Sequence, residues 1–182
     1  MINISENKTL KIWVFISIPL LFILGACFHF LYHWSGNVKI IGAISAVNES
    51  VWEHTKLLLV PILSWWIIFF ITKRERYNIS TSKWFTGMLT SVVTSVFVTM
   101  LVYYFYTEAF GKELIIVDIL ITLLAVGVAQ LLGYHVYKHT KGLTTFTTVI
   151  LVLAILYIYI IWTFNPPHLP LFYDKASGKY GI

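Results

Sequence analysis

The chain has 182 residues, of which 58% are hydrophobic and only 12% are charged. Soluble domains carry about twice this share of charge, so the composition excludes an ordinary soluble domain and favours an integral membrane protein. The net charge of +5 would fit nucleic-acid binding in a soluble protein. Here the basic residues lie between apolar runs, where they set membrane orientation, and the chain carries no nucleic-acid-binding motif.

Five apolar runs are long enough to cross a bilayer, which takes about 20 residues in a helix. They predict one all-α domain over residues 1–182, an integral membrane bundle of five transmembrane helices. The expected helices cover residues of about 12–33, 50–72, 84–107, 113–137 and 142–165. A C-terminal tail follows at 166–182, and we expect it to form an outer cap with the first loop, residues 34–52.

Two segments near the N-terminus have alternative interpretations. Residues 38–47 are apolar but short, which fits either an interfacial helix or a re-entrant loop. The run Leu24-Gly25-Ala26-Cys27 fits a bacterial lipoprotein signal, whose cleavage before Cys27 would leave four helices. The residues after Cys27 are apolar and aromatic rather than a polar tether. We therefore expect Gly25 and Ala26 to pack against a neighbouring helix.

The distribution of lysine and arginine predicts the orientation in the membrane. One side of the expected topology carries eight of the 13 basic residues and the other side carries five. The positive-inside rule places the richer side in the cytoplasm. The chain is therefore expected in the cell membrane with a cytoplasmic N-terminus and an extracytoplasmic C-terminus.

Four of the six histidines fall on the outer side of this topology. His29 and His33 are four residues apart, so they share one helix face and have the spacing of two ligands of one metal ion, with zinc as the candidate. The alternative is two amphipathic side chains at the interface. His135 and His139 have the same spacing on the basic inner side, which shows how easily the pattern arises.

The segment 48–54 places several ionisable groups at the outer membrane surface. The functional interpretation makes His54 a metal ligand, Glu53 or Glu49 a general base and Ser50 a catalytic hydroxyl. In the structural alternative, Ser50 and Glu53 form a capping box and both glutamates complement the helix dipole. His54 would then extend its ring to the interface.

Asp118 and His168 are the remaining candidate ligands. Asp118 lies inside an expected span, where an ionised group is costly and usually paired or functional. It is expected to bind a metal, to accept a proton or to orient a histidine. The structural alternative pairs it with a lysine or with the start of its own helix. His168 lies in a tail stiffened by three prolines. The tail either folds back and brings His168 over the cluster or lies along the headgroups.

Three stretches carry a resemblance: His-Phe-Leu-Tyr-His-Trp-Ser-Gly (29–36), Ala-Val-Asn-Glu-Ser-Val-Trp-Glu-His (46–54) and Pro-Pro-His-Leu-Pro-Leu-Phe-Tyr-Asp (166–174). Together they resemble a family of small bacterial multi-pass membrane proteins of unknown function, and the resemblance covers essentially the whole chain. It implies the membrane fold and brings no activity, cofactor or catalytic residue.

A looser analogy links the chain to transmembrane hydrolases of the alkaline ceramidase type. Those enzymes hold zinc within the membrane through histidines and carry a Ser-x-x-x-His pair and an aspartate. Ser50 and His54 have that spacing, Asp118 lies within a span, and His29 with His33 forms an HxxxH pair. Here the helices are fewer and the HxxxH pair comes first rather than last, so the analogy rests on residue types.

These observations support three hypotheses. The first is a metal-dependent hydrolase or transferase acting on membrane lipid at the outer leaflet. The second is a protein that binds or transports a cation, a proton or a small solute, and the third is a non-catalytic accessory subunit that docks a protein partner or a second copy. In the first, the candidate metal ligands are His29, His33, His54, Asp118 and His168, and the candidate catalytic residues are Glu53, Glu49 and Ser50.

Overall fold

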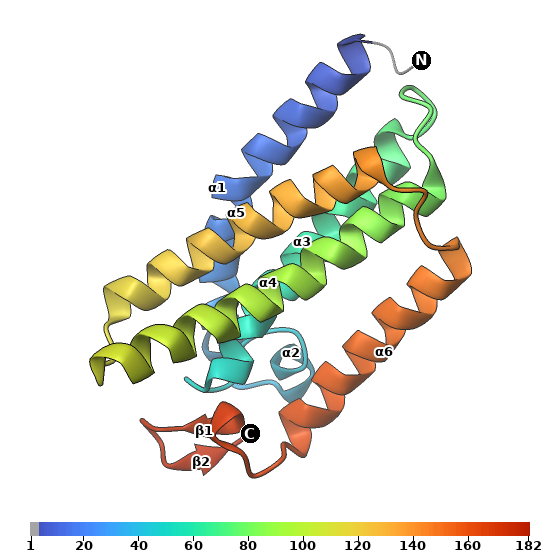
Figure 1. Cartoon of the computed structure of the whole chain (residues 1–182). Coiled ribbons are helices and arrows are strands. Elements are labelled where there is room, and N and C mark those ends of the chain that lie inside the picture. Colours follow the sequence, from blue (N-terminus) through green and yellow to red (C-terminus); the bar gives the residue numbers. More distant parts are fainter. Residues whose placement is uncertain (1–3) are drawn as a thin grey trace.

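The computed structural model describes residues 4–182, with side chains from residue 8 onward. Within these residues the chain is helical apart from a small hairpin near its C-terminus (Figure 1). The helices are α1 (Ile4–Trp34), α2 (Lys39–Gly42), α3 (Val51–Lys73), α4 (Thr81–Phe110), α5 (Ile115–His139) and α6 (Thr145–Phe164). The tail forms the 3₁₀ helix η1 (Pro170–Phe172) and the strands β1 (Tyr173–Asp174) and β2 (Lys179–Tyr180).

Five of the helices, all but α2, are long and apolar enough to cross a membrane. The predicted all-α membrane bundle of five transmembrane helices is confirmed. Several helices extend past the apolar runs that predicted them; α4, for example, has 30 residues. At about 1.5 Å of rise per residue it exceeds the hydrocarbon thickness of about 30 Å, so its ends reach into the headgroup layers.

Helix α3 forms the centre of the bundle. In its most apolar stretch 61% of the residues are buried, against 11% in α6, which lies at the edge and packs on α4. Helices α4 and α5 come into close contact where two glycines meet. A Cβ atom added to Gly133 would lie 2.6 Å from the carbonyl oxygen of Gly87, so the two backbones touch and leave no room for a side chain.

The first loop and the tail pack together into a cap at one end of the bundle. Residues 38–47 resolve into the single turn of α2 followed by irregular turns. In the tail, Phe172 is buried against Trp52, with ring centroids 5.1 Å apart. The hairpin of β1 and β2 was not predicted. Asp174 closes its turn by accepting hydrogen bonds from the backbone N–H of Ala176 and the hydroxyl of Ser177.

Helix α1 runs without a break through residues 24–27. Gly25 lies against α3, since a Cβ atom there would meet the Leu57 carbonyl oxygen at 3.4 Å. Ala26 and Cys27 are exposed. The expected helix contact is therefore made by Gly25 and not by Ala26, and cleavage before Cys27 stays an untested alternative.

Candidate metal centre

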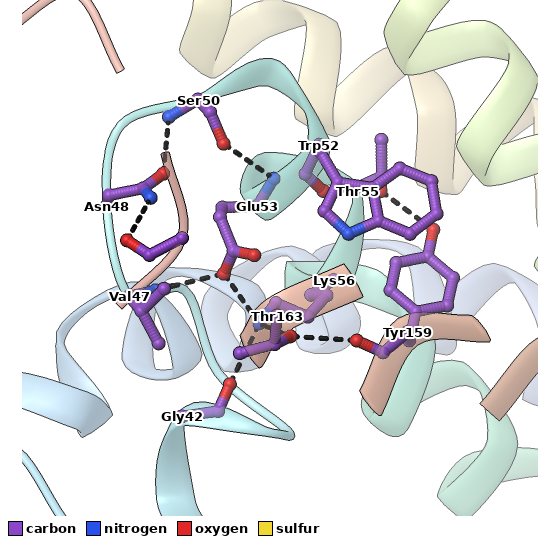
Figure 2. A network of polar contacts seen from close by, with 11 residues as sticks. Gly42, Val47, Asn48, Ser50, Trp52, Glu53, Thr55, Lys56, Tyr159 and Thr163 are labelled. Atoms are coloured by element: carbon purple, nitrogen blue, oxygen red, sulfur yellow. Dashed lines mark hydrogen bonds and ion pairs between the residues drawn. The ribbon is translucent and has the colours of Figure 1, made fainter. Parts of the chain in front are cut away.

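The start of α3 is fixed by side chains of the preceding loop (Figure 2). Ser50 caps the helix by accepting a hydrogen bond from the backbone N–H of Glu53, at 3.4 Å. Asn48 accepts a hydrogen bond from the backbone N–H of Ser50 and donates one to the carbonyl oxygen of Gly181, each at 2.9 Å. One amide therefore joins the first loop, the start of α3 and the tail.

Below this cap lies a buried ion pair, also drawn in Figure 2. Lys56 Nζ is 2.5 Å from Glu53 Oε2, and the two side chains are 0% and 2% exposed. The same carboxylate oxygen accepts a hydrogen bond from the backbone N–H of Val47. Lys56 also donates to the carbonyl oxygen of Gly42 and to the hydroxyl of Thr163, both at 2.8 Å. Both charges are thus compensated by several partners, which a buried ion pair requires.

Glu49 and His54, which flank Ser50 and Glu53 in sequence, form a second, more open cluster with His29 of α1. Glu49 Oε2 lies 3.4 Å from His29 Nε2 and 3.3 Å from His54 Nε2. One ligand atom from each of these three residues falls within 4.8 Å of the others. In a tetrahedral zinc site with bonds of about 2.0 Å, neighbouring ligand atoms lie about 3.3 Å apart. Both contacts of Glu49 therefore match the spacing of neighbouring zinc ligands, and the two histidine atoms lie within 4.8 Å of each other.

A cavity of about 360 Å³ opens beside this cluster, between α3, α4 and α5. Its walls are both apolar and polar, and their polar groups are chiefly acidic or phenolic. The polar lining includes Glu49, His54, Tyr103, Glu113 and Asp118. Two of the carboxylates are held by phenols: Tyr106 donates to Asp118 at 2.6 Å and Tyr103 to Glu113 at 2.8 Å.

Two carboxylates of this region that lie outside the transmembrane helices, Glu49 and Glu113, are stabilised in their ionised form. Hydrogen bonds from His29 and then His54 hold the pKa of the Glu49 carboxyl below its usual range, against the opposing effect of burial. Hydrogen bonds from Lys175 and then Tyr103 lower the pKa of Glu113. The same ion pair raises the pKa of Lys175. The cluster therefore presents carboxylates at neutral pH, the form that binds a cation.

The structure separates the predicted site residues into three groups. His29, Glu49 and His54 come together, and Asp118 lines the adjoining cavity. Ser50 and Glu53 belong to the buried network described above. His33 and His168 are exposed and lie outside the cluster.

The reasons for the two separate histidines are geometric. Spacing by four residues puts His33 on the same broad face of α1 as His29, but it lies one turn nearer the end of the helix. His168 stacks on Tyr180 within the tail, with ring centroids 4.6 Å apart. The tail does fold back over the bundle end, but it brings Lys175 to Glu113 at the cavity.

Sequence reasoning did not identify Tyr103, Tyr106 or Lys175 as part of the site. Tyrosines near a helix end are typical of the membrane interface, so their sequence position does not distinguish a carboxylate partner from an interfacial anchor. Lys175 pairs with Glu113 only because the tail folds over the bundle, which depends on tertiary structure. Only the partner of Asp118 could have been anticipated: a carboxylate within a span requires a hydrogen-bond donor nearby, which here is Tyr106.

Comparison with known proteins gives one match. A family model described as a family of unknown function (DUF6512) matches residues 2–182. Neither the curated proteins nor the solved structures contain a significant match to the chain.

Proposed function

Because the chain belongs to the DUF6512 family, whose function is unknown, we propose its function from the site: it is a membrane-embedded, metal-dependent hydrolase or transferase acting on a lipid headgroup. The observation that carries the proposal is the convergence of His29, Glu49 and His54 beside a cavity. Three protein ligands leave a coordination position open, as catalytic zinc sites do, whereas structural sites are closed by four.

The residues have separate roles in this proposal. His29, Glu49 and His54 would hold a divalent metal ion, which would supply Lewis acidity for hydrolysis or transfer. Asp118 accepts or returns a proton in the cavity, where its hydrogen bond from Tyr106 fixes the carboxylate. Glu53 and Ser50 are left out of the chemistry because the ion pair with Lys56 and the helix cap occupy their polar atoms.

The position and size of the cavity support a lipid substrate. It lies at the ends of three membrane-crossing helices, and isoleucines and a valine line it beside the acidic groups. At about 360 Å³ it is in the range of small-molecule sites, which run from about 300 to 1,000 Å³. A headgroup at the level of the carboxylates and an acyl chain among the apolar residues would match this mixed lining.

A second candidate function is the binding of a cation or a cationic solute without chemistry. It is favoured by the three carboxylates that line one cavity, those of Glu49, Glu113 and Asp118. Transport across the bundle has less support. Below the cavity, Gln130 is fully buried and accepts a hydrogen bond from Trp66, and Ser91 donates to the Ala129 carbonyl oxygen. These polar groups connect closely packed helices and do not line a pathway.

We further propose that the site faces the outside of the cell. Lys56 is buried within α3, so without it the basic residues at the helix ends and in the connecting segments number eight on one side and four, not five, on the other. The positive-inside rule then places the N-terminus in the cytoplasm more clearly than the sequence did alone. Labelling of Lys141→Cys and Lys175→Cys by an impermeant maleimide, in a Cys27→Ala background, tests this: the second should react in intact cells and the first should not.

The decisive experiment is metal content by plasma mass spectrometry after purification in detergent and equilibration with zinc. The wild type should retain about one zinc per chain, and His54→Ala should lose at least tenfold in affinity because two ligands remain. His33→Ala is the matched control, since it removes a histidine of the same HxxxH pair that lies outside the cluster. Equal retention by all three, or no zinc in the wild type, would sink the proposal.

The Asp118→Asn variant then separates catalysis from binding. It keeps an oxygen that can accept the Tyr106 hydrogen bond but removes the base, so zinc should stay bound. Turnover of headgroup substrates should fall by about 10² to 10⁴, the usual contribution of a general base. Zinc binding without turnover in the wild type would favour the second candidate function.

A further inference from the structure

A second cavity lies at the opposite end of the bundle from the metal centre, between the start of α1 and the end of α5. Its volume is about 470 Å³. Five of its lining side chains are basic: Lys8, Lys11, His135, Lys138 and His139. None of the described residues that line it is acidic. Within residues 8–182, none of the three lysines forms an ion pair with a carboxylate, in contrast to Lys56 and Lys175.

We propose that this cavity binds the headgroup phosphate of an anionic phospholipid. Basic pockets between transmembrane helices are the usual binding sites for such headgroups. Three lysines on two helices, with no carboxylate partner among residues 8–182, provide several donors for phosphate oxygens. The histidine rings of His135 and His139, with centroids 4.5 Å apart, add ring N–H donors on the same side.

The order of residues along α5 favours a lipid over free phosphate. The face that lines the cavity runs from Leu131 through Tyr134 to Lys138. These positions are spaced by three and four residues, so they form one stripe. Lys138 lies about 10 Å farther along the axis than Leu131, roughly the depth of a headgroup layer. An acyl chain would contact Leu131, which is 45% exposed, while the phosphate meets Lys138.

Tyr134 lies between these two levels and helps to hold the cation. Lys138 Nζ is 5.5 Å from the centroid of the Tyr134 ring, within cation–π range. An aromatic ring at the level between apolar and charged groups is typical of the membrane interface. The lysine is therefore positioned at headgroup level rather than free in solvent.

The test compares lipid binding by the full chain in nanodiscs made of phosphatidylglycerol or of phosphatidylcholine. Native mass spectrometry should detect phosphatidylglycerol retained by the wild type and little phosphatidylcholine. Lys138→Gln should weaken retention about fivefold, and Lys8→Gln/Lys11→Gln/Lys138→Gln by more than tenfold. The matched control is Lys73→Gln/Arg74→Gln/Arg76→Gln, which removes equal charge from the same end outside the cavity.

The outcomes distinguish the sources of phosphate. Loss in the cavity variants with retention in the control supports the proposal. Equal loss in the control would assign the effect to overall charge and overturn it. Displacement of the lipid by millimolar inorganic phosphate, or equal retention of both lipids, would also overturn it. If the triple variant unfolds, the single variant Lys138→Gln decides the question.

Discussion

Two glutamates four residues apart, Glu49 and Glu53, have opposite environments. Glu53 is 2% exposed and meets a lysine, a backbone N–H and a helix start. Glu49 has a side chain that is 53% exposed and meets two histidines beside a cavity. The first carboxylate has all its partners within the chain, whereas the second retains the capacity to bind something else.

The difference follows from where α3 begins. Glu53 lies inside the helix, three residues from Lys56, so the two side chains share the face that packs against the first loop and α6. Glu49 precedes the cap at Ser50, in a bend of the first loop, and its side chain contacts His29 and His54 instead. The helix cap at Ser50 therefore separates two nearby glutamates: Glu53 joins a buried ion pair, and Glu49 is left as a candidate metal ligand.

The largest expected effect comes from breaking the buried pair. Lys56→Met leaves the Glu53 carboxylate buried without its cation, which should cost about 3–5 kcal/mol of unfolding free energy. Thermal unfolding in detergent, followed by tryptophan fluorescence, measures it. Lys175→Met is the control, because it breaks the exposed pair with Glu113 and should cost less than about 1 kcal/mol.

A double variant sharpens this result. Glu53→Gln/Lys56→Met removes both charges, so it should recover part of the stability lost in Lys56→Met. If Lys56→Met and Lys175→Met lost similar amounts of stability, the buried ion pair would contribute no more than the exposed one, and the contrast would be contradicted.

A medium effect is expected from the amide that joins loop and tail. Asn48→Ala removes the hydrogen bonds to Ser50 and Gly181 and should cost about 1–2 kcal/mol. The tail should also become more sensitive to trypsin at Lys175 and Lys179. Asn48→Asp keeps the acceptor for Ser50 but loses the donor to Gly181. It should therefore release the tail while leaving the start of α3 intact, and an unchanged tail in both variants would refute the connection.

Much of the fold follows from the sequence because membrane spans are read from long apolar runs. The predicted cap at Ser50 is also confirmed, since the Ser-x-x-Glu pattern reports local hydrogen bonding. The side chain of Glu53 departs from the capping-box pattern: it accepts from Val47 rather than from Ser50. The sequence counted Lys56 among the five basic residues of the outer side, whereas its ion pair with Glu53 became evident only from the packing of α3.

The sequence predicted the kinds of residue in the candidate site but not which individual residues come together. His29, Glu49, His54 and Asp118 were selected as ionisable groups that gather on the expected outer side of the membrane. Glu49, His54 and Asp118 line one cavity, and His29 contacts Glu49 beside it. His33 and His168 met the same criterion and lie elsewhere. Spacing by four defines a helix face but not which turn meets the next helix, and that depends on the packing of α1 against α3. The ligand roles of all these residues stay predictions until metal is measured.

The smallest expected effect concerns the pH dependence of Glu49. Its pKa is lowered in the folded chain by His29 and His54, so its contribution to stability is fully present above the usual carboxyl value of 4.5 and is lost as the pH falls through the lower folded value. Because the group is half exposed, the wild type should exceed Glu49→Gln by less than about 1 kcal/mol at pH 7, and the gap should close below pH of about 4.5.

Saturating zinc turns this small effect into a test of the site. A metal that binds only the folded chain adds stability and competes with protons for its ligands. The gap between wild type and Glu49→Gln should then widen at pH 7 and close at a higher pH than without zinc, as protons displace the metal. If the stability difference between wild type and Glu49→Gln depended on pH in the same way with and without zinc, Glu49 would be only a surface partner of two histidines. It would then differ from Glu53 in burial and not in metal binding.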